Sequence, residues 1–307
     1  MGRPIALLLC LLLTAACSQA RAPESAAPAS AAADSATASP SPTPTAAALS
    51  VAAPTPTPIP PPKWDELPVA AQDPDGLGQQ LAMVDAGIRD PNVSGAQLAW
   101  LGHLQQLAYG RLQDFPDWKP AVLAALPEAS RPAVTASLDA GKQLSQLKGP
   151  VPKTLPDWKI VAPRTAETLM GFYKEAEATF GVPWYYLASI HLVETRMGRI
   201  RGLSSAGAQG PMQFMPGTWA MYGKGDINDD HDSILSAARY LVAAGAPNDM
   251  QKALYAYNHS LFYVNALILY ANVMKADPAA YRGYWGWQVY YPTQEGPILL
   301  PVGWSKE

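Results

Sequence analysis

Residues 183–198 read PWYYLASIHLVETRMG and place one acidic side chain, Glu194, in a stretch that is otherwise almost entirely apolar. Pro183 suits the first turn of a helix, because its missing N–H and its fixed φ are tolerated there. Gly198 is suited to ending that helix. A helix that is apolar on nearly every side is buried. The sequence therefore predicts a buried helix with a carboxyl group in its last turn.

Glu194 is expected to hold its proton more tightly than an ordinary glutamate. Leu187, Ile190 and His191 precede it at helical spacing, so the carboxyl group shares a face with large side chains. Desolvation disfavours the carboxylate, and the negative end of the helix dipole repels it. We therefore expect a raised pKa and the role of a general acid. A carboxylate paired with one of the arginines that follow is the structural alternative.

The segment after this helix is punctuated by glycine and carries candidate ligand-binding groups. It reads Gly207-Ala-Gln-Gly210-Pro-Met212-Gln213-Phe214. Glycine lets a backbone approach a ligand closely. Gln213 both donates and accepts hydrogen bonds, as a sugar amide or hydroxyl requires, while Met212 and Phe214 offer apolar surface to a sugar ring. The segment predicts either the wall of a ligand site or a plain turn.

Three short blocks, in this order and spacing, resemble the signature blocks of the soluble and membrane-bound lytic transglycosylases. They are Glu194-Thr195, the run from Gly210 to Phe214, and Ala256-Tyr257-Asn258. Thr195 stands where many members have serine, and it keeps the hydroxyl group. The longer run from Gly210 to Trp219, followed by Asp-Ile-Asn-Asp at 226–229, is most similar to the branch of membrane-bound lytic transglycosylase B, which tolerates Pro211 where many members have leucine. The resemblance covers about half of the chain.

The resemblance implies a mainly α-helical, goose-type lysozyme-like fold that acts on the glycan strands of peptidoglycan without a cofactor. It implies non-hydrolytic cleavage of the MurNAc–GlcNAc β-1,4 bond to give 1,6-anhydro-MurNAc ends, with Glu194 as the catalytic residue. The residues implied in substrate binding are Gln213, Met212, Tyr257 and Asn258, and those implied in support are Thr195 and Gly210. A lysozyme-type muramidase on the same fold and a non-catalytic glycan-binding lipoprotein remain the alternatives.

Four aspartates, Asp226, Asp229, Asp230 and Asp232, gather before a strongly helical segment. A calcium site or a second catalytic carboxylate is one interpretation. Acidic residues are favoured in the turn before a helix, and the spacing lacks the terminal glutamate of a calcium loop. The pattern therefore predicts helix capping, and the chain is expected to hold no metal.

The first residues have the pattern of an export signal. Arg3 precedes a short apolar run, Ile5 to Leu13, which is too short to span a bilayer stably. Thr14-Ala-Ala-Cys17 fits a permissive lipobox, so residues 1–17 are expected to be a signal peptide, with lipid attached at Cys17. The protein is then extracytoplasmic and anchored to a membrane, or secreted if Cys17 is not acylated. Both cysteines of the chain lie in this leader, so no disulfide is expected in the mature domain.

Residues 18–62 consist mainly of Ala, Pro, Ser and Thr. Such a segment buries too little apolar surface to offset the entropy of ordering, so we expect a disordered linker. The formal net charge of the 307-residue chain is −3. That charge argues against a surface for nucleic acid.

Residues 63–150 are expected to form a small helical module, because apolar stripes at helical spacing are bounded by proline and glycine. The expected helices end near Asp90, Phe115, Leu126 and Leu147. A scaffold packed on the catalytic domain is favoured over an independent binding module, since no constellation of polar residues is present. His103 is interpreted as structural.

Residues 151–280 are expected to form the catalytic domain. Thr165 should cap a helix that runs to Phe180, and Asp249 a helix that ends at Tyr257. A further helix is expected over 260–274. Residues 281–307 form a tail in which apolar runs flank the turn at 292–296, which predicts one β-hairpin. The aromatic residues of this tail are expected to pack in the core.

Overall fold

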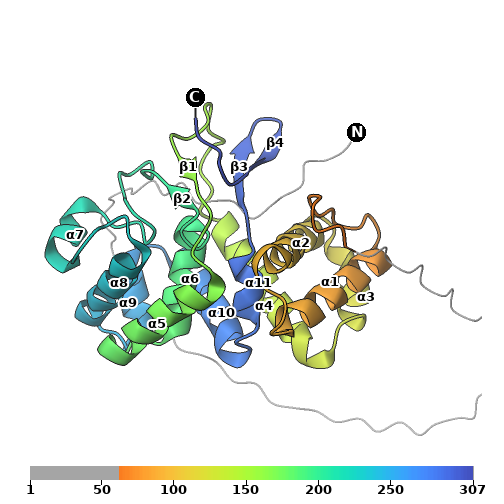
Figure 1. The fold of residues 1–307 in the computed structure, drawn as a ribbon, viewed down its shortest axis with the longest axis horizontal. Helices are drawn as coiled ribbons and strands as arrows, with labels where there is room; N and C mark the ends of the chain where they lie inside the picture. The colour runs from red at the N-terminus through yellow and green to blue at the C-terminus, as the bar shows by residue number, and fades with distance from the viewer. Residues whose placement is uncertain (1–61, 307) are drawn as a thin grey trace, which may run out of the picture.

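The computed structural model of the protein describes residues 62–306 and is mainly helical (Figure 1). The predicted signal peptide, Cys17 and the linker up to residue 61 lie outside the described residues. Among residues 62–306, no helix has both the length and the apolar character needed to cross a bilayer. The predicted mainly α fold with a short C-terminal hairpin is confirmed.

The helices of the N-terminal module follow the predicted apolar stripes. They are α1 (Pro74–Arg89), α2 (Gly95–Asp114), α3 (Lys119–Ala124) and α4 (Arg131–Ser145), with 3-10 turns at Pro116–Trp118 (η1) and Glu128–Ser130 (η2). Asp73 caps α1, since its side chain accepts a hydrogen bond from the N–H of Gly76. The single helix expected from Pro116 to Leu126 is divided into a 3-10 turn and a short helix.

The second part of the chain contains seven further helices in the described residues. They are α5 (Ala166–Phe180), α6 (Trp184–Thr195), α7 (Pro216–Tyr222), α8 (Asp230–Ala244), α9 (Met250–Tyr257), α10 (Leu261–Ala276) and α11 (Ala280–Trp285). The caps agree with the sequence: Thr165 accepts from the N–H of Thr168, and Asp249 accepts from the N–H of Lys252. The sequence analysis did not predict α7 and α11.

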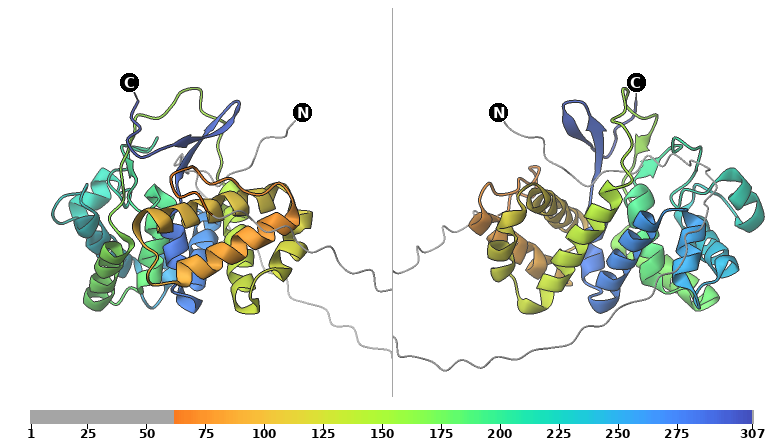
Figure 2. Two further views of the ribbon diagram at one scale, coloured as in Figure 1. Left: turned by 45° about the vertical axis from the view of Figure 1, so that its right-hand side comes forward. Right: turned by 180° about the vertical axis from the view of Figure 1, so that it is seen from behind.

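The N-terminal module and the rest of the chain share one hydrophobic core. Helix α4 packs along α10, as Figure 2 shows from behind, and α2 packs on α11. Gly102 on α2 is required by this packing, because a Cβ atom there would collide with the carbonyl oxygen of Gly283 on α11. Trp287 is fully buried at the junction and donates its indole N–H to Gln105 Oε1 at 3.0 Å. The module thus packs on the second part, as expected of a scaffold.

The strands form two small antiparallel pairs, β1 (Lys159–Ile160) with β2 (Ile200–Arg201) and β3 (Val289–Thr293) with β4 (Gly296–Leu300). They enclose a second small core of Trp158, Ile160, Ile200, Val289, Tyr291 and Leu300. The first pair was not predicted, because two-residue strands leave no periodic pattern. The predicted hairpin is confirmed, and it is stabilised by this core, since an isolated hairpin is marginal.

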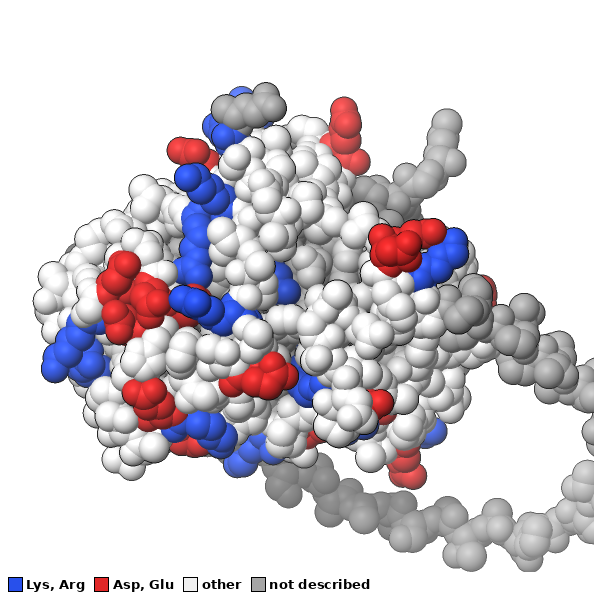
Figure 3. All heavy atoms as spheres, viewed as in Figure 1, with Lys and Arg blue, Asp and Glu red and all other residues white. Residues whose placement is uncertain are grey.

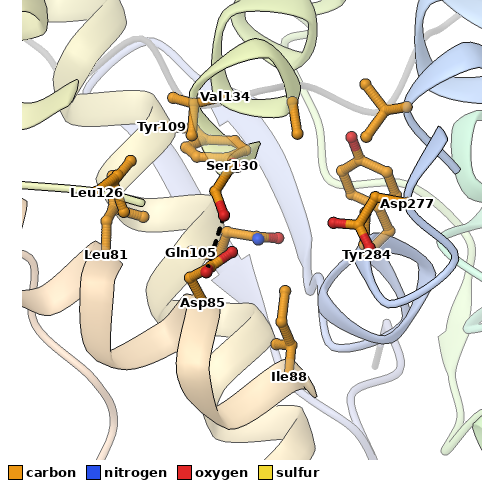
Figure 4. A pocket seen from close by; sticks show the side chains of 13 residues that line it. Leu81, Asp85, Ile88, Gln105, Tyr109, Leu126, Ser130, Val134, Asp277 and Tyr284 are labelled. Carbon is orange, nitrogen blue, oxygen red and sulfur yellow. Dashed lines mark hydrogen bonds between the residues drawn. The ribbon is translucent and has the colours of Figure 1, made fainter. Parts of the chain in front are cut away.

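A cavity of about 20 Å³ lies in the seam between α1, α2 and the α10–α11 region (Figure 4). Asp85 and Ser130 contact each other in its wall, at 2.9 Å between Ser130 Oγ and Asp85 Oδ2. Arg89 links Asp85 to Asp277 across the seam, with N–O distances of 3.0 and 2.6 Å. The few polar groups in its mainly apolar wall and its volume suit about one water molecule, so this cavity belongs to the packing of the two parts.

Candidate active site

Helix α6, which carries Glu194, is held at its start by α5 and ends in a left-handed turn. At its start, Glu177 Oε1 on α5 accepts the N–H of Trp184 at 3.1 Å. Its last residue is Thr195, and Arg196 then turns into the left-handed region with φ 55°. The helix therefore ends before Gly198, where the sequence analysis placed its end. Glu194 stands in the last turn, as predicted.

The Glu194 carboxyl group has a short hydrogen bond and a raised pKa. Tyr263 donates its hydroxyl proton to Glu194 Oε1, with 2.5 Å between the oxygens. Burial raises the pKa of Glu194 to about 7, and the bond from Tyr263 opposes this rise because it stabilises the anion. The side chain is nevertheless partly exposed. Glu194 thus combines a proton held near neutral pH with access from solvent.

Tyr263 is the partner of the Glu194 carboxyl group that the sequence analysis missed. It lies in the first turn of α10, is fully buried, and contacts an acid 69 positions away in the chain. Burial raises its pKa well above the usual value for tyrosine, so its hydroxyl remains a donor. In the sequence it stands next to Val264 in an apolar helix, where a tyrosine looks like core. The signal in the sequence was its hydroxyl group, because a buried tyrosine hydroxyl usually needs a hydrogen-bond partner.

Thr195 connects the end of α6 to the glycine-punctuated loop. Its hydroxyl donates to the carbonyl oxygen of Pro211 at 2.5 Å and accepts from the N–H of Gly198 at 3.1 Å. Gly210 has φ 72°, and a Cβ atom there would collide with the carbonyl of Ile227. The close approach that Gly210 permits is therefore to this chain's own backbone, and not to a ligand. Both residues support the loop that follows Glu194.

Met212 is not placed as the resemblance implied. Its side chain is fully buried in the main core, so it presents no apolar surface to a sugar ring, and Phe214 is buried as well. The apolar residues of this loop instead anchor it to the helices. The Met212 carbonyl oxygen accepts the hydroxyl proton of Tyr257 at 2.7 Å. Met212 is therefore corrected from a substrate-binding side chain to a structural one.

Tyr257 was expected to contact the carboxyl group or the sugar, and the structure gives its hydroxyl another partner. That hydroxyl bonds to Met212, while Tyr263 bonds to Glu194. The negative charge of an ionised Glu194 contributes to raising the pKa of Tyr257, which puts the two side chains in one neighbourhood. Tyr257 thus fixes the loop beside the acid.

Gln213 and Asn258 are both half-buried. Gln213 has φ 51°, and its side-chain N–H donates to the carbonyl of Gly210 at 2.9 Å. Asn258 follows the last residue of α9, and within residues 62–306 its side-chain amide has no recorded hydrogen-bond partner. The amide oxygen of Gln213 and the whole amide of Asn258 remain available to a polar ligand.

The acidic segment before α8 performs the predicted capping. Asp229 Oδ1 accepts the backbone N–H groups of His231 and Asp232 at 2.9 and 3.2 Å. Asp226 accepts from Asn228, and Asp232 accepts from the N–H of Asp226. Side-chain oxygen and nitrogen atoms of Asp229, His231 and Asp232 lie within 4.8 Å of one another. A cation bound here would contact these three residues, but the carboxylates of Asp229 and Asp232 already accept hydrogen bonds from backbone N–H groups.

Asp230 lies beside His191 of α6 in a buried ionic cluster. Its Oδ2 accepts from Arg201 at 2.7 Å, and its Oδ1 lies 3.6 Å from His191 Nε2. His191 Nδ1 in turn contacts the hydroxyl of Tyr173 at 2.7 Å. Burial lowers the pKa of His191 to about 3, so this imidazole is neutral. The cluster ties α6 to α5 and α8.

Glu194 lines neither of two hollows on the described residues. One is the seam cavity of Figure 4, and the other, of about 380 Å³, lies beside α9 and the start of α10 and is lined by Asp249, Gln251, Lys252, Tyr255 and Leu261. Access to Glu194 therefore depends on the partial exposure of its own side chain. On the face shown in Figure 3, basic and acidic side chains are interspersed among uncharged ones.

The candidate site falls within a region that is similar to a known family. Residues 171–276 match the family model described as Transglycosylase SLT domain. This region runs from the middle of α5 to the end of α10, and so contains Glu194, Gln213, Tyr257 and Tyr263. The match supports the resemblance to lytic transglycosylases and a lysozyme-like fold for this region. Searches of curated proteins and of solved structures each found no match.

The other residues named from the sequence pack as structural groups. His103 Nε2 contacts the hydroxyl of Tyr290 at 2.9 Å, and burial lowers the pKa of His103 to about 4. The aromatic residues of the C-terminal tail are buried, as the sequence analysis expected: Trp285, Trp287, Tyr290 and Tyr291. They contribute to the core and not to the Glu194 neighbourhood.

Proposed function

We propose that this protein is a lytic transglycosylase that cleaves the MurNAc–GlcNAc β-1,4 bond of peptidoglycan without water. The single observation that carries the proposal is Glu194: a partly exposed carboxyl group with a pKa of about 7, in a region that matches the transglycosylase SLT domain. A carboxylic acid that is still protonated near neutral pH is suited to general acid catalysis.

In the proposed reaction, Glu194 donates its proton to the glycosidic oxygen as the bond from that oxygen to C1 of MurNAc breaks. The resulting carboxylate then removes the proton of the muramyl C6 hydroxyl, whose oxygen bonds to C1. The products are a free hydroxyl on GlcNAc and a 1,6-anhydro-MurNAc end, and Glu194 is again protonated. Tyr263 stabilises the intermediate carboxylate, since its O–H donates to Oε1.

The surroundings of the other acids favour this reaction over hydrolysis. A water-using inverting glycosidase needs a second carboxylate about 6.5–9.5 Å from the first. The candidates in this chain are Asp226, Asp229, Asp230 and Asp232, and each is bonded to backbone N–H groups or to Arg201. In the proposed reaction the nucleophile belongs to the substrate, so one carboxyl group is sufficient.

Gln213 and Asn258 are the proposed ligands of the sugar. The Gln213 amide oxygen is oriented by the bond from its own N–H to Gly210, and the Asn258 amide is half-buried at the end of α9. Both groups match the N-acetyl and hydroxyl groups of the glycan, which donate and accept hydrogen bonds. Tyr257 acts indirectly, through the loop that carries Gln213. The run from Gly210 to Trp219, with the segment 226–229 after it, favours the branch of membrane-bound lytic transglycosylase B.

The proposed place of action is outside the cytoplasm, with the protein anchored to a membrane through lipid on Cys17. Support comes from the leader and from the lipobox pattern. Cell fractionation of the intact chain and of Cys17→Ala tests it. The intact chain should sediment with membranes and the variant should not. Equal recovery of both in the soluble fraction would favour simple secretion.

The activity is tested by digesting purified sacculi and determining the released muropeptides by mass spectrometry. The account predicts ends that are lighter by one water than reducing sugars. Reducing ends would identify a muramidase. Binding to sacculi without any release would identify a non-catalytic glycan-binding protein. Glu194→Gln is the control, and it should release neither product.

A further inference from the structure

Two arginines that follow Glu194 in the chain point into the protein. After Thr195 the backbone takes left-handed conformations at Arg196 and Met197, with φ 55° and 60°. The residues Arg196 and Arg199 are 1% and 2% exposed. Arginine is almost never buried to this extent unless its charge is paired.

Backbone carbonyls and indole rings are the recorded partners of these two guanidinium groups. Arg196 Nη1 donates to the carbonyl of Leu192 at 2.7 Å, and Arg199 Nη1 donates to the carbonyl of Arg196 at 3.0 Å. The guanidinium carbons lie 6.0 Å from the ring centroid of Trp287 and 5.6 Å from that of Trp285, respectively. Indole faces attract cations, but they do not neutralise a buried charge.

Several buried donors in this region have no acceptor among residues 62–306. Within residues 62–306, neither arginine forms an ion pair with a carboxylate. The buried atoms without a hydrogen-bond partner include Nε and Nη2 of Arg196 and Nε of Arg199. The hydroxyl of Tyr270 is a fourth such donor. Its ring lies 5.9 Å from that of Trp287, the indole that Arg196 covers.

The two positive charges also act on each other. Burial and the charge of Arg196 together lower the pKa of Arg199 to about 9. A like charge at close range disfavours the charged form, and an anion between the two groups would remove this cost. The same anion would accept the N–H groups and the Tyr270 hydroxyl, none of which has an acceptor within the described residues.

We propose that Arg196, Arg199 and Tyr270 bind one small inorganic anion of the size and charge of chloride. The site lies where α6, α10 and the segment carrying Trp285 and Trp287 meet, beside the junction with the N-terminal module. It is distinct from the seam cavity of Figure 4, whose wall contains Asp85 and Asp277 and repels an anion. The anion stabilises the folded state, because it binds there and not to the unfolded chain.

The test is thermal unfolding of the intact chain in sodium chloride, in sodium bromide and in sodium gluconate at equal ionic strength. Gluconate is too large to enter a buried site of this kind. Chloride and bromide should each raise the unfolding midpoint by about 2–4 °C relative to gluconate. Equal midpoints in the three salts would overturn the proposal.

A variant that removes one of the buried charges tests whether the chloride dependence of the unfolding midpoint arises at this site. Arg196→Met should lose the chloride dependence of the midpoint. Arg131→Met is the matched control, since Arg131 is half-buried and donates to the carbonyl of Leu126, and it should keep that dependence. Loss of the dependence in both variants would contradict the assignment.

Anomalous diffraction from crystals grown in bromide gives a readout that does not require the variant to fold. A bromide peak between the two guanidinium groups supports the site. Peaks confined to the protein surface would mean an adventitious ion only, and would overturn it. None of these measurements involves a glycan, so their results are independent of the proposed function.

Discussion

Glu194 lies in helix α6 and Asp230 packs against that helix. Burial raises the pKa of both carboxyl groups, but their partners differ in charge. Glu194 has a neutral donor, Tyr263, and stays partly exposed. Asp230 is buried and has cations, Arg201 at 2.7 Å and Arg164 at 3.8 Å, which oppose the rise. The comparison teaches that a buried acid beside a neutral donor can keep its proton near neutral pH, whereas a buried acid beside cations is part of an ionic cluster.

The largest expected effect distinguishes the two acids by activity. Glu194→Gln should lose at least about two orders of magnitude in the rate of glycan cleavage, because the amide cannot donate a proton to the leaving oxygen. Circular dichroism should show an unchanged fold. Asp230→Asn, assayed per folded molecule, should lose far less. A larger loss in the Asp230 variant would reverse the assignment of roles.

The second effect distinguishes them by stability. Asp230→Asn should lower the free energy of unfolding by on the order of 2 kcal/mol, because Arg201 then lacks its anionic partner in a buried cluster. Urea denaturation measures this. Asp139→Asn is the control, since its pair with Lys142 at 3.6 Å is exposed, and it should change stability by less than about 0.5 kcal/mol. Equal losses in the two variants would mean that the buried cluster contributes no more to stability than an exposed ion pair.

The fold was predictable where local chemistry determines it. Apolar stripes and the caps at Thr165 and Asp249 determine whole helices, and these were found where expected. The end of α6 was misplaced because Arg196, a non-glycine residue, takes the left-handed conformation. The strands β1 and β2 arise from long-range contacts, which a local pattern does not contain.

The site was predictable in part for the same reason. The position of Glu194 in a buried helix predicted its raised pKa. Its partner Tyr263 was missed because that contact exists only after α10 packs on α6. Met212 was misassigned because a thioether suits a core as well as a sugar face, and only packing decides between them.

A third effect is the pH dependence of stability. The pKa of Glu194 is raised from 4.5 to about 7 in the folded state, so its contribution is fully present below the unfolded pKa and is lost as pH rises through 7. Glu194→Gln should therefore gain stability relative to the intact chain between about pH 4.5 and 7, by on the order of 3 kcal/mol. Urea titrations across this range measure the difference. A constant difference would contradict the raised pKa.

The smallest effect concerns the neutral partner. The bond from Tyr263 lowers the pKa of Glu194 relative to burial alone, so Tyr263→Phe should move the alkaline limb of the kcat/KM profile to higher pH, by less than about one unit. Tyr257→Phe is the matched control, because that hydroxyl bonds to Met212, and its limb should not move. A shift to lower pH in Tyr263→Phe would mean that the bond stabilises the protonated acid instead.

The most direct test is a ¹³C NMR titration of the Glu194 side-chain carboxyl group in the folded protein, with the resonance assigned by its absence in Glu194→Gln. The account predicts a midpoint near pH 7. A midpoint near 4.5, the ordinary value for a glutamate, would show that this carboxyl group is ionised at neutral pH and cannot be the proton donor.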